Sequence, residues 1–232
     1  MAALAAPRLQ KVDVVNIAQD VDLVNIYHDI CRMTIRKRPY HHGDLRAALL
    51  DEATRMIAEE GTESVTMRAI GRRLDVSRSA AYRHFPNKEA LLVAVATQGF
   101  TRLHALLQAI DVAGADSDVA QLRQMGETYL RFAVENPARY RLMYGNEALK
   151  RERYPQLQSA ANGLLEELVQ IIMSYQRAGA IKNHDARSLA YVAWSAVHGL
   201  ASLVIDGQMQ APHDLDALTR LTTQTLIEGM KS

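Results

Sequence analysis

Side chains that hydrogen-bond to bases and phosphates are concentrated in one short stretch, residues 76–88, which reads VSRSAAYRHFPNK. An arginine can donate two hydrogen bonds to guanine O6 and N7, and a serine hydroxyl can pair with several bases. Tyrosine, histidine and lysine groups can reach phosphate oxygens, which set the register of a protein on DNA. The stretch is better suited to contacting a duplex than to forming a core.

The flanking residues predict the helices that position this stretch. An apolar helix is expected over residues 67–74, with Thr66 as its N-cap, followed by a turn at residues 75–77. Ser77 then caps a second short helix that ends near residues 84–86, and Asn87 caps the next helix. Two short helices joined by a tight turn are typical of a helix-turn-helix that reads DNA.

Position along the second helix separates two kinds of contact. Its first residues enter the major groove, so we predict base contacts for Arg78, Ser79 and Ala80, with the Ala80 methyl close enough for a thymine methyl. Arg83, further along the helix, is grouped with the base contacts but could serve either role. We predict phosphate contacts for Thr66, Arg68, Tyr82, His84 and Lys88. Alone, each of the cations Arg78, Arg83 and Lys88 would be interpreted as an ordinary solvated charge. Together, at these spacings and behind two capped helices, they favour DNA binding.

The division of charge supports the same interpretation. The chain has a formal net charge of +1, but residues 33–88 hold 11 Lys and Arg against 7 Asp and Glu, whereas residues 89–232 hold 13 against 15. A basic module on a mildly acidic body is expected where one end of a protein meets nucleic acid.

The rest of the chain predicts an all-α protein. Hydrophobic residues make up 48% of the 232 residues, which is enough for a substantial core, and no strand-like alternation persists. About nine helices are expected, at residues 43–60, 67–74, 77–85, 88–112, 118–135, 138–144, 156–178, 186–206 and 214–231. We predict an N-terminal extension at 1–35, a three-helix DNA-binding domain at 36–92 and a helical bundle at 93–232.

Several features have two interpretations or exclude a class of protein. Residues 1–32 either precede a true start at Met33 or form a loosely attached extension, the alternative being an extra packed helix. Residues 36–38, Arg-Lys-Arg, are either a DNA-tracking arm or a solubilising tail. The pair His41-His42 lacks partners at ligand spacing, so no metal or cofactor is expected.

The single cysteine, Cys31, excludes an intrachain disulfide and fits the cytoplasm, and the apolar run at 189–205 predicts a buried helix rather than a membrane span.

The stretch from Tyr40 to Val95 resembles the TetR family of bacterial transcriptional regulators. The resemblance lies in Gly61 after an amphipathic helix and in the segments TMRAIG at 66–71, LDVS at 74–77, YRHF at 82–85 and NKEALL at 87–92. It implies a homodimer that binds a near-palindromic operator and releases it when a small molecule enters the C-terminal bundle. Two positions depart from the family pattern: Asp75 replaces the usual Gly, and Ala81 replaces the usual Leu beneath the recognition helix.

The segment AWSAVHGL at 193–200 resembles the Trp…His-Gly signature of one TetR C-terminal subclass. Trp194 and His198 share a helix face, so they either line an effector pocket or belong to the core. The candidate pocket residues are Tyr129, Phe132, Met143, Tyr144, Trp194 and His198. The same resemblance places the dimer interface on the last two helices.

The sequence therefore predicts a homodimeric repressor that binds double-stranded operator DNA and responds to a small molecule. A constitutive, ligand-independent DNA-binding regulator is the first alternative. The second is an enzyme with His198 as general base, which would need a carboxylate or nucleophile beside that imidazole.

Overall fold

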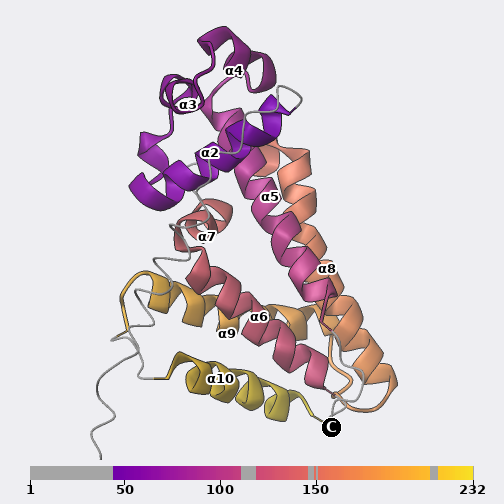
Figure 1. Ribbon diagram of the computed structural model, residues 1–232. Coiled ribbons are helices and arrows are strands. Elements are labelled where there is room, and N and C mark those ends of the chain that lie inside the picture. Colours follow the sequence, from indigo (N-terminus) through magenta and orange to yellow (C-terminus); the bar gives the residue numbers. More distant parts are fainter. Residues whose placement is uncertain (1–43, 111–118, 146–148, 150, 210–213, 232) are drawn as a thin grey trace, which may run out of the picture. The chain divides into compact units, whose positions relative to one another are not determined.

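The computed structural model describes residues 44–110, 119–145, 149, 151–209 and 214–231. Over these residues the chain is helical, with one isolated antiparallel bridge between Ile181 and Lys231. The nine α-helices of the described residues bear the labels of Figure 1. The predictions for residues 1–43, which include the Arg-Lys-Arg segment and the histidine pair, and the predicted helix ends at 111–112 and 118 lie outside the described residues.

Three short helices form the DNA-binding module: α2 (Leu45–Glu60), α3 (Met67–Arg73) and α4 (Arg78–His84). Side-chain caps begin each of them, because Asp44, Thr66 and Ser77 accept hydrogen bonds from the backbone N–H groups of Ala47, Ala69 and Ala80. The predicted ranges agree with these helices to within two residues. Figure 1 shows the three helices grouped at one end of α5.

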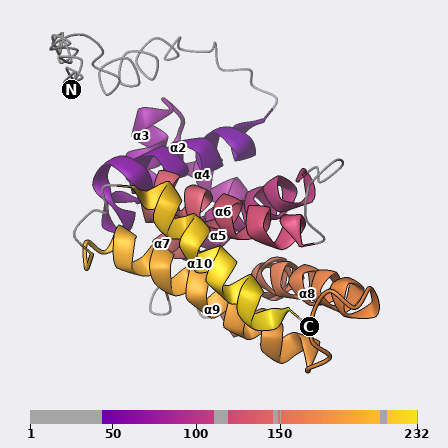
Figure 2. The same cartoon turned by 90° about the horizontal axis from the view of Figure 1, so that it is seen from below.

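The remaining helices form the bundle. They are α5 (Lys88–Gln108), α6 (Ala120–Glu135), α7 (Pro137–Tyr144), α8 (Pro155–Arg177), α9 (Ala186–Ile205) and α10 (Leu215–Met230). Helix α6 packs against both α9 and α10, α5 packs against α8 and α7, and α7 also contacts α2. Figure 2 shows α9 and α10 lying side by side. One hydrophobic core extends from α2 through α5 into the bundle.

Two helices, α5 and α9, are long and apolar enough to cross a membrane by length and composition alone. In α5 half of the most apolar 18-residue stretch is buried inside the protein, as in a core helix. In α9 only 22% of it is buried, and Tyr191, Val192 and Leu203 are exposed. The prediction of a buried helix at 189–205 is therefore correct only for the face of α9 that packs on α6, α8 and α10.

Candidate DNA interface and ligand cavity

The turn between α3 and α4 is tightly packed. The Val76 N–H donates a 2.9 Å hydrogen bond to the Gly71 carbonyl, and a Cβ atom at Gly71 would lie 3.2 Å from the Val76 carbonyl oxygen. Asp75 adopts a φ of 54°, the left-handed region that favours glycine. Asp75, which replaces the family's usual glycine, is therefore held in a backbone conformation that most residues with a side chain avoid.

Helix α4 has one buried and one exposed face. Ala81 and Phe85 are buried against the module, and only 9% of Ala80 is exposed. Arg78, Ser79, Tyr82, Arg83 and His84 are exposed. The predicted contact of Ala80 with a thymine methyl disagrees with this burial, because the helical period turns its methyl group toward the core. Ala81, which stands where the family usually has leucine, is fully buried.

The exposed side chains of α4 and its surroundings form the candidate DNA interface. The Arg78 guanidinium lies 5.3 Å from the centre of the Tyr82 ring, which holds both side chains on one surface. Thr66 and Arg68 are exposed at the start of α3. Lys88 Nζ lies 3.6 Å from Glu63 Oε2, a contact with a fully solvated carboxylate that a phosphate can replace.

Sequence reasoning missed the ion-pair cluster that holds α3 on α2. Glu52 is 5% exposed and accepts hydrogen bonds from Arg55 and from Arg73 of α3, the latter at 3.2 Å. Arg73 also pairs with Glu59 and Glu60, and its pKa is raised chiefly by the hydrogen bond to Glu52 and next by the one to Glu59. The sequence did contain a sign of this cluster. Glu52 follows Leu49 by three residues, which places its carboxylate on the apolar face of α2, where a charge needs a partner.

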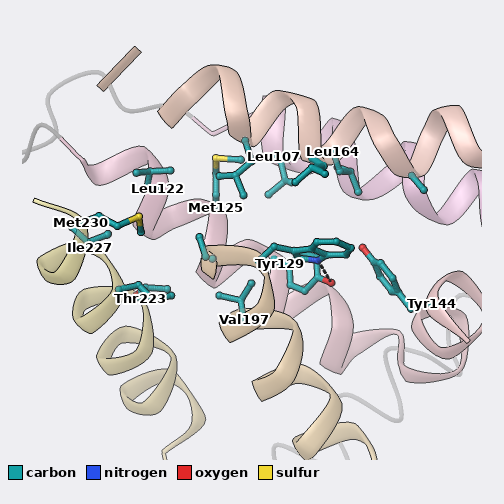
Figure 3. Close-up of a pocket in the computed structure, with 17 residues that line it drawn as sticks. Leu107, Leu122, Met125, Tyr129, Tyr144, Leu164, Val197, Thr223, Ile227 and Met230 are labelled. Carbon is teal, nitrogen blue, oxygen red and sulfur yellow. Dashed lines mark hydrogen bonds between the residues drawn. The ribbon is translucent and has the colours of Figure 1, made fainter. Parts of the chain in front are cut away.

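A cavity of about 90 Å³ lies within the bundle and is shown in Figure 3. Six helices contribute to its wall, and the lining residues are overwhelmingly aliphatic. They are Leu107, Leu122, Met125, Gly126, Tyr129, Tyr144, Ala161, Leu164, Leu165, Leu168, Ala193, Trp194, Val197, Thr223, Leu226, Ile227 and Met230. Such a wall, with few polar groups, is typical of a small-molecule site.

A hydrogen-bonded aromatic cluster closes one end of the cavity. The Trp194 indole N–H donates to the Tyr129 hydroxyl at 3.2 Å. The hydroxyls of Tyr129 and Tyr140 lie 3.0 Å apart, and they approach Nδ1 of His198 at 2.9 and 2.5 Å. A neutral His198 with its proton on Nε2 accepts a hydrogen bond from one hydroxyl at the single lone pair of Nδ1, and the other hydroxyl can donate to its tyrosine neighbour. The hydrogen-bond partners of His198 Nδ1 are therefore tyrosine hydroxyls.

Burial determines the charge state of this cluster. It raises the pKa of Tyr129 and Tyr140 well above the ordinary value and raises that of Tyr144 to about 12. Burial, and secondarily the nearby Arg151 cation, lower the pKa of His198. The tyrosines and the histidine of the cluster are thus all neutral near pH 7.

Three of the six predicted pocket residues, Tyr129, Tyr144 and Trp194, line the cavity. Phe132 and Met143 are buried in the core instead, and His198 lines a neighbouring surface hollow that shares Tyr144 with the cavity. That hollow also holds Asp206, which pairs with Arg141 at 2.9 Å. The general-base alternative receives no support, since the polar partners found for Nδ1 of His198 are tyrosine hydroxyls and the Asp206 carboxylate pairs with an arginine.

The fold and the exposed recognition helix define a helix-turn-helix DNA-binding regulator. Residues 49–95 match the family model described as bacterial regulatory proteins of the tetR family, and residues 122–226 match the model described as the tetracyclin repressor-like C-terminal domain. The two matches cover both the DNA-binding module and the bundle. The chain belongs to the TetR family of transcriptional regulators.

Individual relatives agree with this assignment. The chain is 24% identical over 190 residues to the uncharacterized HTH-type transcriptional regulator Rv0681 of Mycobacterium tuberculosis, covering 80% of this chain and 81% of that protein. It is 39% identical over 70 residues to the HTH-type transcriptional repressor KstR of the same organism, covering 30% and 32%. A structure of a protein with unknown function from Rhodococcus sp. RHA1 is 31% identical, with a TM-score of 0.73, covering 84% of this chain and all of that one.

Proposed function

We propose that this regulator is a cytoplasmic homodimeric repressor that leaves its operator when a small molecule fills the bundle cavity. The observation that carries the proposal is the position of Tyr144, which lines the cavity and belongs to α7, while α7 also contacts α2 of the DNA-binding module. The relation to KstR, whose name describes a repressor, supports repression. The Trp194…His198-Gly199 segment supports the Trp…His-Gly subclass.

The proposed DNA contacts follow from exposure on α4 and around it. Arg78, Ser79 and Arg83 would contact base edges in the major groove. Thr66, Arg68, Tyr82, His84 and Lys88 would contact phosphates. Arg73 is outside both sets because three carboxylates surround it.

The exposed apolar surface of the last two helices supports a homodimer. Tyr191, Val192 and Leu203 of α9 and Leu221 of α10 are each 46% exposed or more. A second copy packed on this surface by two-fold symmetry would bury it and present two recognition helices. Their spacing would match half-sites about 34–36 Å apart, one turn of DNA, or a multiple of it.

Contacts between helices provide a route by which cavity occupancy can reach the DNA-binding module. Tyr140 and Tyr144 of α7 belong to the aromatic cluster, and Met143 packs on α5 so closely that a Cβ at Gly99 would lie 2.6 Å from its sulfur. A ligand that displaces Tyr144 would therefore push on α7, which packs on α5 and contacts α2. The cavity favours this mechanism over constitutive, ligand-independent binding.

Selection of bound sequences from a random DNA pool tests the proposal. We expect a near-palindromic operator, and Arg78→Ala should relax the preference at one base pair per half-site, at about 1–3 kcal/mol per lost contact. Lys88→Ala is the matched control, because loss of a phosphate contact weakens all sequences about equally. An unselective wild-type pool, or an unchanged preference in Arg78→Ala, would contradict the assignment.

A further inference from the structure

The cavity wall is polar at one end only. The 17 lining residues include no charged side chain, and the polar ones are Tyr129, Tyr144, Trp194 and Thr223. The Thr223 hydroxyl is already used within α10, where it donates to the carbonyls of Thr219 and Arg220 at 3.0 Å each. Hydrogen-bond donors for a ligand are therefore confined to the aromatic end, and the rest of the wall is hydrocarbon apart from the Thr223 oxygen, which can only accept.

We propose that the cavity binds an uncharged amphiphile, with one oxygen-bearing head group at the Tyr129–Tyr144–Trp194 end and an alkyl tail along the aliphatic wall. This inference rests on the proposed effector function and names its ligand class. The head group hydrogen-bonds to the Tyr144 hydroxyl, which points toward Tyr129 in Figure 3. The tail lies among Leu122, Met125 and Ile227.

The electrostatics of the wall exclude an ionised head group. An isolated carboxylate or ammonium loses its hydration in such a cavity, and a counter-charge must replace it. The cation near this end is Arg151, but its guanidinium lies over the Tyr144 ring, 5.4 Å from the ring centre, and donates to the Met143 carbonyl. It is not part of the cavity wall. The tyrosines remain protonated, so they provide hydrogen bonds and no charge.

The size of the cavity adds a condition. Its volume of about 90 Å³ is smaller than the engineered cavity of about 150 Å³ that holds benzene. An alkyl chain therefore has to displace wall side chains, and Met125 and Met230 are unbranched thioethers that adapt readily. Binding and movement of the wall are thus coupled.

The chain has a single tryptophan, Trp194, and it lies in the cavity wall, so its fluorescence reports occupancy without DNA. We would titrate the full chain at pH 7.5 with 1-octanol, octanoate and octylammonium, which share one alkyl chain and differ in charge. A saturable change with 1-octanol is expected, and at least tenfold weaker binding of both ions. Equal or tighter binding of either ion, or no response to 1-octanol, would overturn the proposal.

Two matched variants locate the head group. Tyr144→Phe keeps the ring and removes the hydroxyl, so binding of 1-octanol should weaken about fivefold, as expected for one hydrogen bond. Tyr154→Phe is the control, because this tyrosine is outside the wall and bonds to Glu89. Equal effects of the two variants, or none in Tyr144→Phe, would contradict the assigned orientation.

A separate measurement distinguishes this inference from the function on which it rests. After an operator has been selected, 1-octanol is added to the protein–DNA complex. If the tryptophan titration shows binding and the complex nevertheless persists, effector control fails and the ligand class stands. If octanoate or octylammonium releases the DNA more effectively than 1-octanol, effector control stands and the ligand class fails.

Discussion

Asp75 combines an unfavourable backbone conformation with a negative charge beside the recognition helix. Its φ of 54° costs L-residues about 1–2 kcal/mol, and Asn and Asp tolerate it best. Asp75→Asn keeps this tolerance and removes the charge. We therefore expect Asp75→Asn to bind operator more tightly at low salt with an unchanged Tm. Fluorescence anisotropy at several salt concentrations, with thermal melts, checks both expectations.

Asp75→Gly separates the conformational effect from the charge. Glycine relieves the Cβ clash, but the greater freedom of the unfolded chain offsets about 0.5–1 kcal/mol of the gain. We expect a net increase of about 0.5 kcal/mol in the free energy of unfolding.

Operator affinity in Asp75→Asn that equals the wild type at low salt would show that the charge at Asp75 does not face the DNA.

His198 makes stability depend on pH. Its pKa is lowered in the folded state, chiefly by burial, from an unfolded value of about 6.5. Below pH 6.5 the unfolded chain binds the proton first, so stability is complete above this pH and falls as the pH decreases toward the folded pKa. Protonation also removes the acceptor at Nδ1 that Tyr140 uses.

Melting curves between pH 7.5 and pH 5 check this expectation. The fall in Tm should be smaller in His198→Asn than in the wild type, because the asparagine does not titrate. His184→Asn is the control, since it also removes an imidazole but at an exposed position. A fall in Tm that is the same in His198→Asn and the wild type would assign the pH dependence to other groups.

At the scale of elements, Gly126 permits the close crossing of α6 and α10. A Cβ at this position would lie 2.5 Å from Thr223 Cγ2, and Thr223 is a stiff, buried, β-branched side chain. Gly126→Ala should therefore lower the free energy of unfolding by about 1–3 kcal/mol. Chemical denaturation measures the change, and the cavity response of Trp194 should change with it because both residues line the wall.

Gly163 provides the matched control in α8. Nothing lies within 4 Å of a Cβ there, so Gly163→Ala should stabilise the protein by about 0.5–1 kcal/mol through helix propensity. Thr223→Ser removes the clashing methyl group and should restore much of the stability lost in Gly126→Ala. Equal effects of the two alanine substitutions would show that α6 and α10 do not meet at Gly126.

The helices were predictable because their ends are local signals. Thr66, Ser77 and Asn87 each cap the helix expected of them, and Gly61 follows α2. The cavity was only partly predictable, since a leucine such as Leu164 in a cavity wall has the same helical spacing as one in a core. Tyr129 and Trp194 stood out because they are aromatic, whereas the burial of Phe132 depends on long-range packing.

At the scale of the whole molecule, one continuous set of contacts links the cavity to the DNA-binding helices. Tyr144 and Trp194 meet at the cavity, with ring centres 6.1 Å apart, and α7 extends from there to α2. Glu52 and Arg73 then hold α3 on α2. Because close-packed protein interiors transmit strain, we expect a displacement at the cavity to reach α2 and α3 through these contacts.

The apolar surface of α9 leads to a prediction about the assembly. Leu203→Glu places a charge on the proposed dimer surface, whereas Leu106→Glu places one at a similarly exposed leucine of α5. We expect Leu203→Glu to sediment as a monomer and Leu106→Glu as a dimer, both with the helical circular dichroism of the wild type. Because two linked modules bind paired half-sites far more tightly than one, operator affinity of the monomer should fall by about 100-fold or more. A dimeric Leu203→Glu with full operator affinity would place the interface elsewhere.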